Sequence, residues 1–154
     1  MKLPVTGGAG YLGSVLVPRL LQAGHQVTVV DTLMYGQQSL LHVYGQPGFE
    51  FIWGDVRDEA LMQRLLKSAD GIVPLAALVG APACARDPWL ASSVNQEAVQ
   101  MMLRHRSPAQ LIVYPTTNSG YGTTSADQPC TADTPLVPIS LYGETKARAE
   151  RDIL

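Results

Sequence analysis

A glycine-rich turn near the start of the chain limits the possible folds more than any other feature. Residues 5–14 read VTGGAGYLGS and join a short apolar run to a segment whose apolar residues have helical spacing. Gly7, Gly10 and Gly13 have the spacing of three glycines with separate roles: one for a tight turn, one for a close approach of backbone to ligand, and one for close packing of helix on strand. The N–H groups and positive dipole end of such a helix suit a pyrophosphate.

An acidic residue downstream supports a nucleotide-binding turn. Residues 26–30 form a second apolar, β-prone run, and Asp31 follows it. The dinucleotide-binding fingerprint requires an acid at this place, about twenty residues after the glycines. A glycine pattern alone is a weak signal, since it also occurs in plain turns between a strand and a helix. The flanking strand, the helix and Asp31 together favour nucleotide binding.

Composition limits the partners and the location that we expect. The 154 residues carry a net charge of -2, so the chain lacks the basic balance typical of nucleic-acid binding. No apolar run is long enough to span a membrane. Met1 and Lys2 lead directly into the first predicted strand, which leaves no room for a signal peptide. Cys84 and Cys130 lie far apart and are expected to be reduced, so we expect a cytoplasmic location.

Predicted strands and helices alternate along the chain. The strands are expected at 3–6, 26–30, 49–53, 72–75 and 111–114, and the helices at 11–23, 58–67, 88–104 and 140–154. This alternation predicts an α/β fold, a doubly wound parallel sheet (Rossmann fold) with helices on both faces and strand order 3-2-1-4-5. Two prolines oppose regular elements: Pro4 removes a donor from the central strand, and Pro18 is expected to kink the first helix at a cost of about 3 kcal/mol.

A tyrosine and a lysine near the end of the chain indicate proton chemistry. Tyr142 and Lys146 lie four residues apart, on one face of the last predicted helix. An ammonium group beside a phenol favours the phenolate, a general base able to deprotonate an alcohol or sugar hydroxyl. Surface helices carry such pairs too, so the position of the helix favours the catalytic interpretation. It follows the fifth predicted strand, and ligands of this fold bind at the carboxyl ends of strands. Residues 116–122, directly after that strand, add hydroxyls able to hydrogen-bond a reacting oxygen, although alone they indicate only a turn.

Together these segments resemble the extended short-chain dehydrogenase/reductase family, the NAD-dependent epimerases and dehydratases of nucleotide sugars. The resemblance covers the whole chain. It is carried by six segments: TGGAGYLG at 6–13, GDVRD at 54–58, LAA at 75–77, VN at 94–95, the strand and loop at 113–122, and PISLYGETK at 138–146.

The resemblance implies that the chain binds NAD. Asp31 would accept hydrogen bonds from the adenosine ribose hydroxyls and would repel a 2′-phosphate, so NAD is favoured over NADP. Asp55 and Val56 would lie at the adenine. The full set of implied cofactor-binding residues is Gly7, Gly10, Tyr11, Leu12, Asp31, Asp55, Val56, Leu75, Ala76, Ala77, Asn95, Tyr142 and Lys146.

The resemblance also implies catalytic roles for Thr117, Tyr142 and Lys146. Tyr142 would take the proton of a sugar hydroxyl while hydride moves to NAD, giving a keto-sugar, and Thr117 would position that hydroxyl. Lys146 would hold the nicotinamide ribose and tune Tyr142. Asn95 would help to seat the backbone of the active site. Return of the hydride to the opposite face would invert the carbon, which is epimerisation.

Two departures from the family pattern affect this interpretation. Pro74 stands in the stretch before Ala76 where the family usually carries a histidine, which implies an altered cofactor pocket. The family's 4,6-dehydratases place at least one acid just after the active-site threonine. Here Asn118 and Ser119 follow, and neither is an acid or base at neutral pH. This favours an epimerase or a reductase over a dehydratase.

Residues 1–154 are therefore expected to form an NAD-binding Rossmann domain that is incomplete. The resembling enzymes continue for roughly as much chain again, which would carry the last strands and the substrate-binding part. The full-length enzyme is expected to bind a nucleotide sugar as a homodimer. No metal site is expected, because the three histidines have no neighbours at ligand spacing. Two alternatives stay open: a non-catalytic dinucleotide-binding module or remnant, and an NAD-dependent dehydratase or reductase of a sugar or small carbonyl compound.

Overall fold

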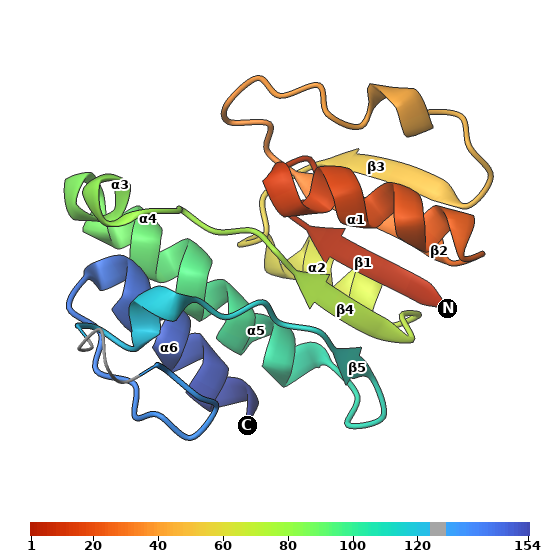
Figure 1. Cartoon of the computed structure of the whole chain (residues 1–154). Coiled ribbons are helices and arrows are strands. Elements are labelled where there is room, and N and C mark those ends of the chain that lie inside the picture. Colours follow the sequence, from red (N-terminus) through yellow and green to blue (C-terminus); the bar gives the residue numbers. More distant parts are fainter. Residues whose placement is uncertain (124–128) are drawn as a thin grey trace. The chain divides into compact units, whose positions relative to one another are not determined.

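The computed structural model describes residues 1–123 and 129–154, and strands and helices alternate along it as predicted (Figure 1). The strands are β1 (Lys2–Thr6), β2 (Gln26–Asp31), β3 (Phe49–Trp53), β4 (Gly71–Pro74) and β5 (Leu111–Ile112). The helices are α1 (Tyr11–Gln22), α2 (Glu59–Leu66), α3 (Ala81–Arg86), α4 (Pro88–Ser92), α5 (Ala98–His105) and α6 (Leu141–Ile153). Two 3-10 turns, η1 (Leu41–Val43) and η3 (Asn118–Gly120), and one π-helical turn, η2 (Ser93–Glu97), complete the described elements.

The five strands form one parallel sheet in the order β3-β2-β1-β4-β5. This confirms the predicted doubly wound topology. β5 is shorter than the predicted strand at 111–114, and Pro74 gives the reason. The Val113 N–H donates to the carbonyl of Ile72, at 3.0 Å. The next donor of a parallel ladder would be the N–H of residue 74, which proline lacks, so the pairing ends there.

Pro4 and Pro18 disturb their elements less than the sequence suggests. The pairing of β1 with β2 runs without a break from Lys2 to Thr6, with Pro4 opposite Thr28. The pairing of β1 with β4 covers only Val5 and Thr6, so the missing N–H of Pro4 falls outside that ladder. α1 likewise continues past Pro18 as one helix. The strand and the helix expected around these prolines are therefore both present, and β1 runs without a break although Pro4 has no N–H to donate.

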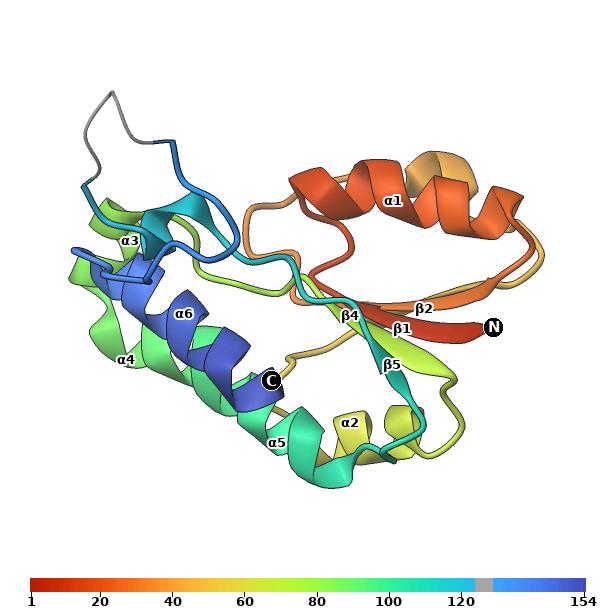
Figure 2. The same cartoon turned by 60° about the horizontal axis from the view of Figure 1, so that its bottom comes forward.

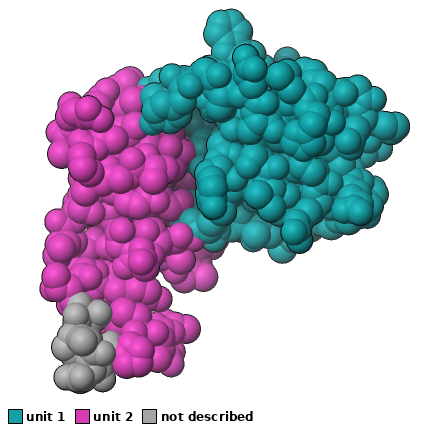
Figure 3. Space-filling model, turned by 45° about the horizontal axis from the view of Figure 1, so that its top comes forward, with its two compact units in different colours: residues 1–76, 101–115 teal, residues 77–100, 116–154 magenta. Residues whose placement is uncertain are grey.

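Contacts divide the described residues into two compact units (Figure 3). Each unit has its own buried cluster of apolar residues. Unit 1 comprises 1–76 and 101–115 and holds the sheet, α1 and α2. Unit 2 comprises 77–100 and 116–154 and holds α3, α4, η2, η3 and α6. The predicted helix at 88–104 is present as α4, η2 and α5 in succession, with the π-helical turn in its middle.

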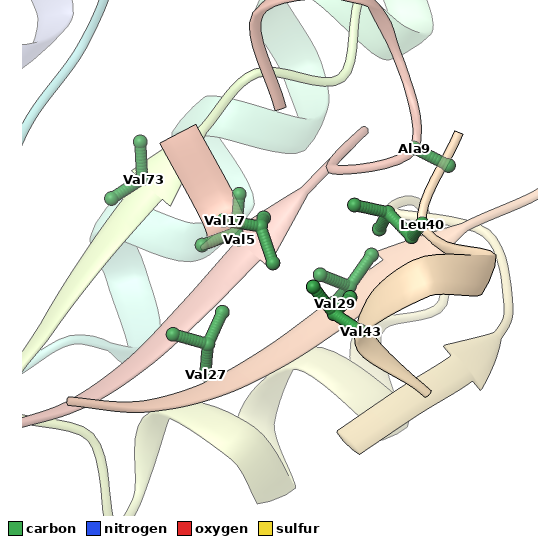
Figure 4. Packing of buried hydrophobic residues seen from close by; sticks show 8 residues of the cluster. All are labelled: Val5, Ala9, Val17, Val27, Val29, Leu40, Val43 and Val73. Carbon is green, nitrogen blue, oxygen red and sulfur yellow. The ribbon is translucent and has the colours of Figure 1, made fainter. Parts of the chain in front are cut away.

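The core of unit 1 lies between α1 and the sheet. Val5 on β1 and Val27 and Val29 on β2 are fully buried beside Val17 of α1 (Figure 4). The two β2 valines are two residues apart, so both side chains lie on the same face of the sheet. α2 covers the other face (Figure 2). Its N-cap is Asp58, whose carboxylate accepts from the N–H of Leu61. Helices on both faces make this the doubly wound arrangement expected.

The core of unit 2 includes α3, a helix that was not predicted from the sequence. α3 lies between the predicted strand at 72–75 and the predicted helix at 88–104, where no helix was predicted, and it starts after Gly80, whose φ is +93°. Cys84 of α3 is fully buried with Leu78 and Ala91, and the side chain of Tyr142 packs against this cluster. The Cys84 thiol donates to the carbonyl of Leu78. No helix of the two described ranges has the length and apolar character needed to cross a membrane.

Candidate active site

The glycine-rich turn lies directly against the end of β4. Gly7 has a φ of +66°, a conformation that side chains disfavour. A Cβ at Gly7 would lie 2.6 Å from both the Cα and the N of Ala76. The N–H of Gly7 donates to the carbonyl of Val30, at 2.8 Å. Within unit 1, the turn therefore crosses the ends of β2 and β4 at a distance that only glycine permits.

The start of α1 is equally close to this turn and has no side-chain cap. A Cβ at Gly13 would lie 2.0 Å from the carbonyl oxygen of Gly8. The N-cap, Gly10, has no side chain to accept from the first N–H groups, which lack partners within any α-helix. Tyr11 and Leu12, the first two helical residues, are 90% and 55% exposed. These features make the turn a suitable cradle for a phosphate pair.

Asp31 connects the end of β2 to the glycine-rich turn. It is 8% exposed. Its Oδ2 accepts from the N–H of Ala9 at 3.0 Å, and its Oδ1 accepts from the N–H of Leu33 at 2.8 Å and from the Gln37 amide at 3.2 Å. A carboxylate has about four acceptor sites, so these three bonds leave room for one further donor, on Oδ2. Asp31 therefore holds the turn through Ala9 and keeps one acceptor position, and its bond to a ribose hydroxyl stays a prediction.

The segment expected at the adenine is held by its own charged pair. Arg57 donates from Nη2 to Oδ2 of Asp55 at 2.6 Å and from Nε to Oδ1 at 3.0 Å. This guanidinium and the backbone N–H of Arg57 hold the pKa of the Asp55 carboxyl below its usual range. Val56 is buried. The carboxylate is thus occupied by Arg57, and binding of adenine at Asp55 and Val56 stays a prediction.

Asn95 is the centre of a buried hydrogen-bond network in unit 2. Its Oδ1 accepts from the N–H of Leu78 at 2.8 Å, and its amide nitrogen donates to the Leu78 carbonyl at 3.1 Å. The same nitrogen donates to the hydroxyl of Thr145 at 3.2 Å, and that hydroxyl bonds the carbonyl of Leu141 at 2.9 Å. Asn95 and Thr145 are 1% and 0% exposed. The network fixes the start of α6 to the segment after β4, and Asn95 lies in a π-helical turn, a form frequent at functional sites.

The Thr117 turn packs on α6 beside Tyr142. A Cβ at Gly143 would lie 2.4 Å from the carbonyl oxygen of Ser119, so only glycine fits at this contact. The Thr117 hydroxyl accepts from the N–H of Ser119 at 3.2 Å and caps η3. On the other side, Ser140 caps α6 by accepting from the N–H of Gly143. The glycine after Tyr142 therefore keeps the hydroxyl-bearing turn close to the helix that carries Tyr142.

Lys146 is buried one helical turn after Tyr142. It is 4% exposed, and burial lowers the pKa of its amine to about 8, while the Glu150 carboxylate acts in the opposite direction. Tyr142 is partly buried. A buried cation acts on charges around it more strongly than an exposed one, because water screens it less. α6 thus carries Tyr142 and Lys146 one helical turn apart, and the role of Tyr142 as a general base stays a prediction.

The structure groups the predicted site residues by unit. Gly7, Asp31 and Ala76 lie together in unit 1, where Leu75 continues the sheet by donating to the Thr6 carbonyl. Ala77 begins unit 2, which contains the Asn95, Thr117, Tyr142 and Lys146 described above. Two residues escaped the sequence reasoning: Thr145 and Glu150. The sequence signal for both is their distance from Lys146: Thr145 comes one residue before it, and Glu150 comes four residues after it. Among residues 1–123 and 129–154, no three His, Cys, Asp or Glu side chains are grouped so as to hold a metal ion.

Comparison with known proteins places this site in a family. The model of the NAD dependent epimerase/dehydratase family matches residues 3–154. The chain belongs to this family. UDP-glucose 4-epimerase of Lactobacillus helveticus is 32% identical over 155 residues, which are 98% of this chain and 46% of that protein. dTDP-glucose 4,6-dehydratase of an Actinoplanes species is 36% identical over 164 residues, which are 97% of this chain and 50% of that protein.

Solved structures agree with this membership. DesIV of Streptomyces venezuelae, a dTDP-glucose 4,6-dehydratase determined as a double mutant with NAD and DAU bound, matches with a TM-score of 0.89 and 31% identity. The match covers 99% of this chain and 50% of that one. UDP-glucose 4-epimerase of Thermus thermophilus, in complex with NAD, matches with a TM-score of 0.86 and 27% identity over 99% of this chain and 50% of that one. The chain therefore spans about half the length of these relatives and has the fold of an enzyme family.

Proposed function

We propose that the protein is an NAD-dependent epimerase that acts on a nucleotide sugar through a transient keto-sugar, and that this chain is its cofactor-binding half. The observation that carries the proposal is α6, where a buried lysine lies one helical turn after a tyrosine and a hydroxyl-bearing turn packs beside that tyrosine. The family membership of residues 3–154 supports it.

The residues of unit 1 fit NAD. The turn at Gly7 and Gly10 is free of side chains where a pyrophosphate would approach, and the first N–H groups of α1 would donate to it. Asp31 keeps one acceptor position, which suits a ribose hydroxyl and disfavours a 2′-phosphate. When bound, NAD supplies a hydride acceptor that can return the hydride.

The proton chemistry falls to the residues of α6 and the turn beside it. Tyr142 as phenolate removes the proton from a sugar hydroxyl and later returns it to the same oxygen. The Lys146 ammonium stabilises the phenolate form of Tyr142, and the Thr117 hydroxyl hydrogen-bonds the reacting oxygen. Asn95 and Thr145 keep the start of α6 in place during both transfers.

A 4,6-dehydratase is the second candidate, because one relative of that activity is 36% identical. Loss of water requires a further acid and base near the threonine. The two residues after Thr117 are Asn118 and Ser119, which have no such capacity at neutral pH. This difference favours the epimerase.

Product analysis tests the proposal. The chain is incubated with NAD and with UDP-glucose or dTDP-glucose, the sugars named for its relatives, and the products are identified by NMR. Inversion of one sugar carbon supports the epimerase, and a deoxy keto-sugar supports the dehydratase. In an active preparation, Tyr142→Phe should lower turnover by about 10²–10⁴-fold and leave NAD affinity nearly unchanged. NAD binding without any product, in this chain and in a longer one, would favour the non-catalytic module.

A further inference from the structure

Glu150 contacts the segment that carries the predicted active-site threonine. It lies on α6, four residues and so one helical turn after Lys146. Its carboxylate oxygen Oε2 accepts a hydrogen bond from the hydroxyl of Thr116, the residue directly before Thr117. Glu150 is partly buried, whereas Thr116 is exposed. One carboxylate therefore bonds the threonine segment and lies one helical turn from the lysine of the candidate site.

The other carboxylates of α6 have different partners. Glu144 pairs with Arg148 on the same helix. Asp152 accepts hydrogen bonds from the side chains of Gln96 and Gln100. Glu150 is also the carboxylate whose charge raises the pKa of the buried Lys146 amine, against the effect of burial. Its position is thus distinct from that of the acids on either side of it.

We propose that Glu150 is a positioning residue of the candidate active site: it fastens the Thr116–Thr117 segment to α6 and places a negative charge one helical turn from Lys146. The inference rests on the roles proposed for Thr117 and Lys146. A hydrogen bond to a charged acceptor is stronger than one to a neutral group, so a carboxylate suits the fastening role. The same charge favours the ammonium form of the lysine, which is the form that stabilises a phenolate.

Three substitutions separate the two actions of Glu150. Glu150→Gln removes the charge but keeps an oxygen that can accept from Thr116. Thr116→Val removes the hydrogen bond and keeps the charge. Glu150→Ala removes both. Asp152→Asn is the matched control, because it removes a carboxylate from the same helix without touching Thr116.

The first measurement is the titration of Lys146, followed by NMR in the full chain with labelled lysine. The chain contains only three lysines, so the signals of Lys2 and Lys67 serve as references. In the unaltered protein we expect Lys146 to titrate at about 8. Glu150→Gln and Glu150→Ala should lower the pKa of Lys146 further, because the attraction that raises it is gone. Thr116→Val and Asp152→Asn should leave it unchanged.

The second measurement is hydrogen exchange at the N–H of Ser119, which bonds the Thr117 hydroxyl. Thr116→Val and Glu150→Ala should speed this exchange by about threefold to tenfold, the effect of one lost hydrogen bond. Glu150→Gln should speed it less than Glu150→Ala, because a neutral oxygen still accepts from Thr116, and Asp152→Asn should leave it near the original rate. Exchange at Val29, in the core of unit 1, reports whether a variant has lost stability throughout.

The pattern of results decides the proposal. The proposal is overturned if Glu150→Gln does not change the pKa of Lys146. It is also overturned if Asp152→Asn shifts this pKa equally, because that result indicates a general effect of helix charge. Unchanged exchange at Ser119 in Thr116→Val and Glu150→Ala also overturns it. None of these readouts involves NAD or turnover. A failure here therefore leaves the proposed function standing and is distinguishable from a failure of the epimerase assay, which would remove the catalytic roles that Glu150 is proposed to support.

Discussion

Replacing Gly13 with alanine tests the contact that holds the glycine-rich turn to α1. In an ordinary helix interior this change stabilises the protein by about 1 kcal/mol, because alanine is the better helix former. At Gly13 the added Cβ would lie 2.0 Å from the carbonyl oxygen of Gly8, whereas real Cβ atoms essentially never approach within 3.0 Å. The turn and α1 must therefore separate by about 1 Å, the difference between these two distances.

The cost of this separation exceeds the gain in helix propensity. The carbonyl carbon and the Cα of Gly8 would also lie at 2.5 and 2.6 Å, and backbone atoms cannot rotate aside. Inserting one methyl group into filled space costs about 1–3 kcal/mol, and we expect the upper part of this range. After the propensity gain is subtracted, Gly13→Ala should lose about 1–2 kcal/mol of unfolding free energy. For a chain of this length, the melting temperature should fall by roughly 2–8 °C.

Urea unfolding, followed by circular dichroism, measures the effect. Coincident near- and far-ultraviolet transitions would justify a two-state treatment for the two units. The control is Val15→Ala, at an exposed position two residues further along α1, which should change stability by no more than about 0.5 kcal/mol. NAD affinity, measured by calorimetry, should fall in Gly13→Ala and not in the control. A Gly13→Ala protein as stable as the original, or more stable, would refute the argument.

Three further predictions concern the cofactor, the lysine and the sheet edge. NAD should bind more tightly than NADP in calorimetric titrations, and Asp31→Ala should narrow the difference; equal affinities in the unaltered chain would contradict the role of this carboxylate. Folding lowers the pKa of Lys146 to about 8 from an ordinary 10.5, so between these pH values the unfolded chain binds more protons than the folded one. The free energy of unfolding should therefore rise with pH in this range, compared with Lys146→Met. If urea unfolding shows a difference between the two proteins that does not change with pH, the prediction is contradicted. In the part of the chain that the structure describes, β5 pairs only with β4, and Leu111 and Val113 are about half exposed. The chain should therefore self-associate in sedimentation, and Leu111→Lys should reduce this association.

The arrangement of the sheet was predictable from the sequence, because the features that determine it are local. Alternating apolar runs and helical patterns define the order of elements, and the glycine-rich turn identifies β1 and α1. The length of β5 was not predictable in this way. It depends on Pro74, a residue of another strand about forty positions earlier, which has no N–H for the carbonyl of Val113. From the sequence, Pro74 is recognisable only as a departure from the family pattern, because its effect on β5 depends on the register of the two strands.

The candidate site shows the same division between local and distant causes. Tyr142 and Lys146 are recognisable because helix geometry alone places residues four apart on one face. The start of α6, which carries Tyr142 and Lys146, is held by a hydrogen bond between Asn95 and Thr145. These two residues are fifty positions apart in the sequence, and no spacing rule connects them. An unpartnered polar group at such a buried position costs about 1–3 kcal/mol, so neither residue can change alone without affecting the start of α6. The groups proposed to move the proton therefore belong to a local motif that the sequence identifies. The bond between Asn95 and Thr145 joins distant positions, which explains why the sequence implied a seating role for Asn95 but did not identify its partner.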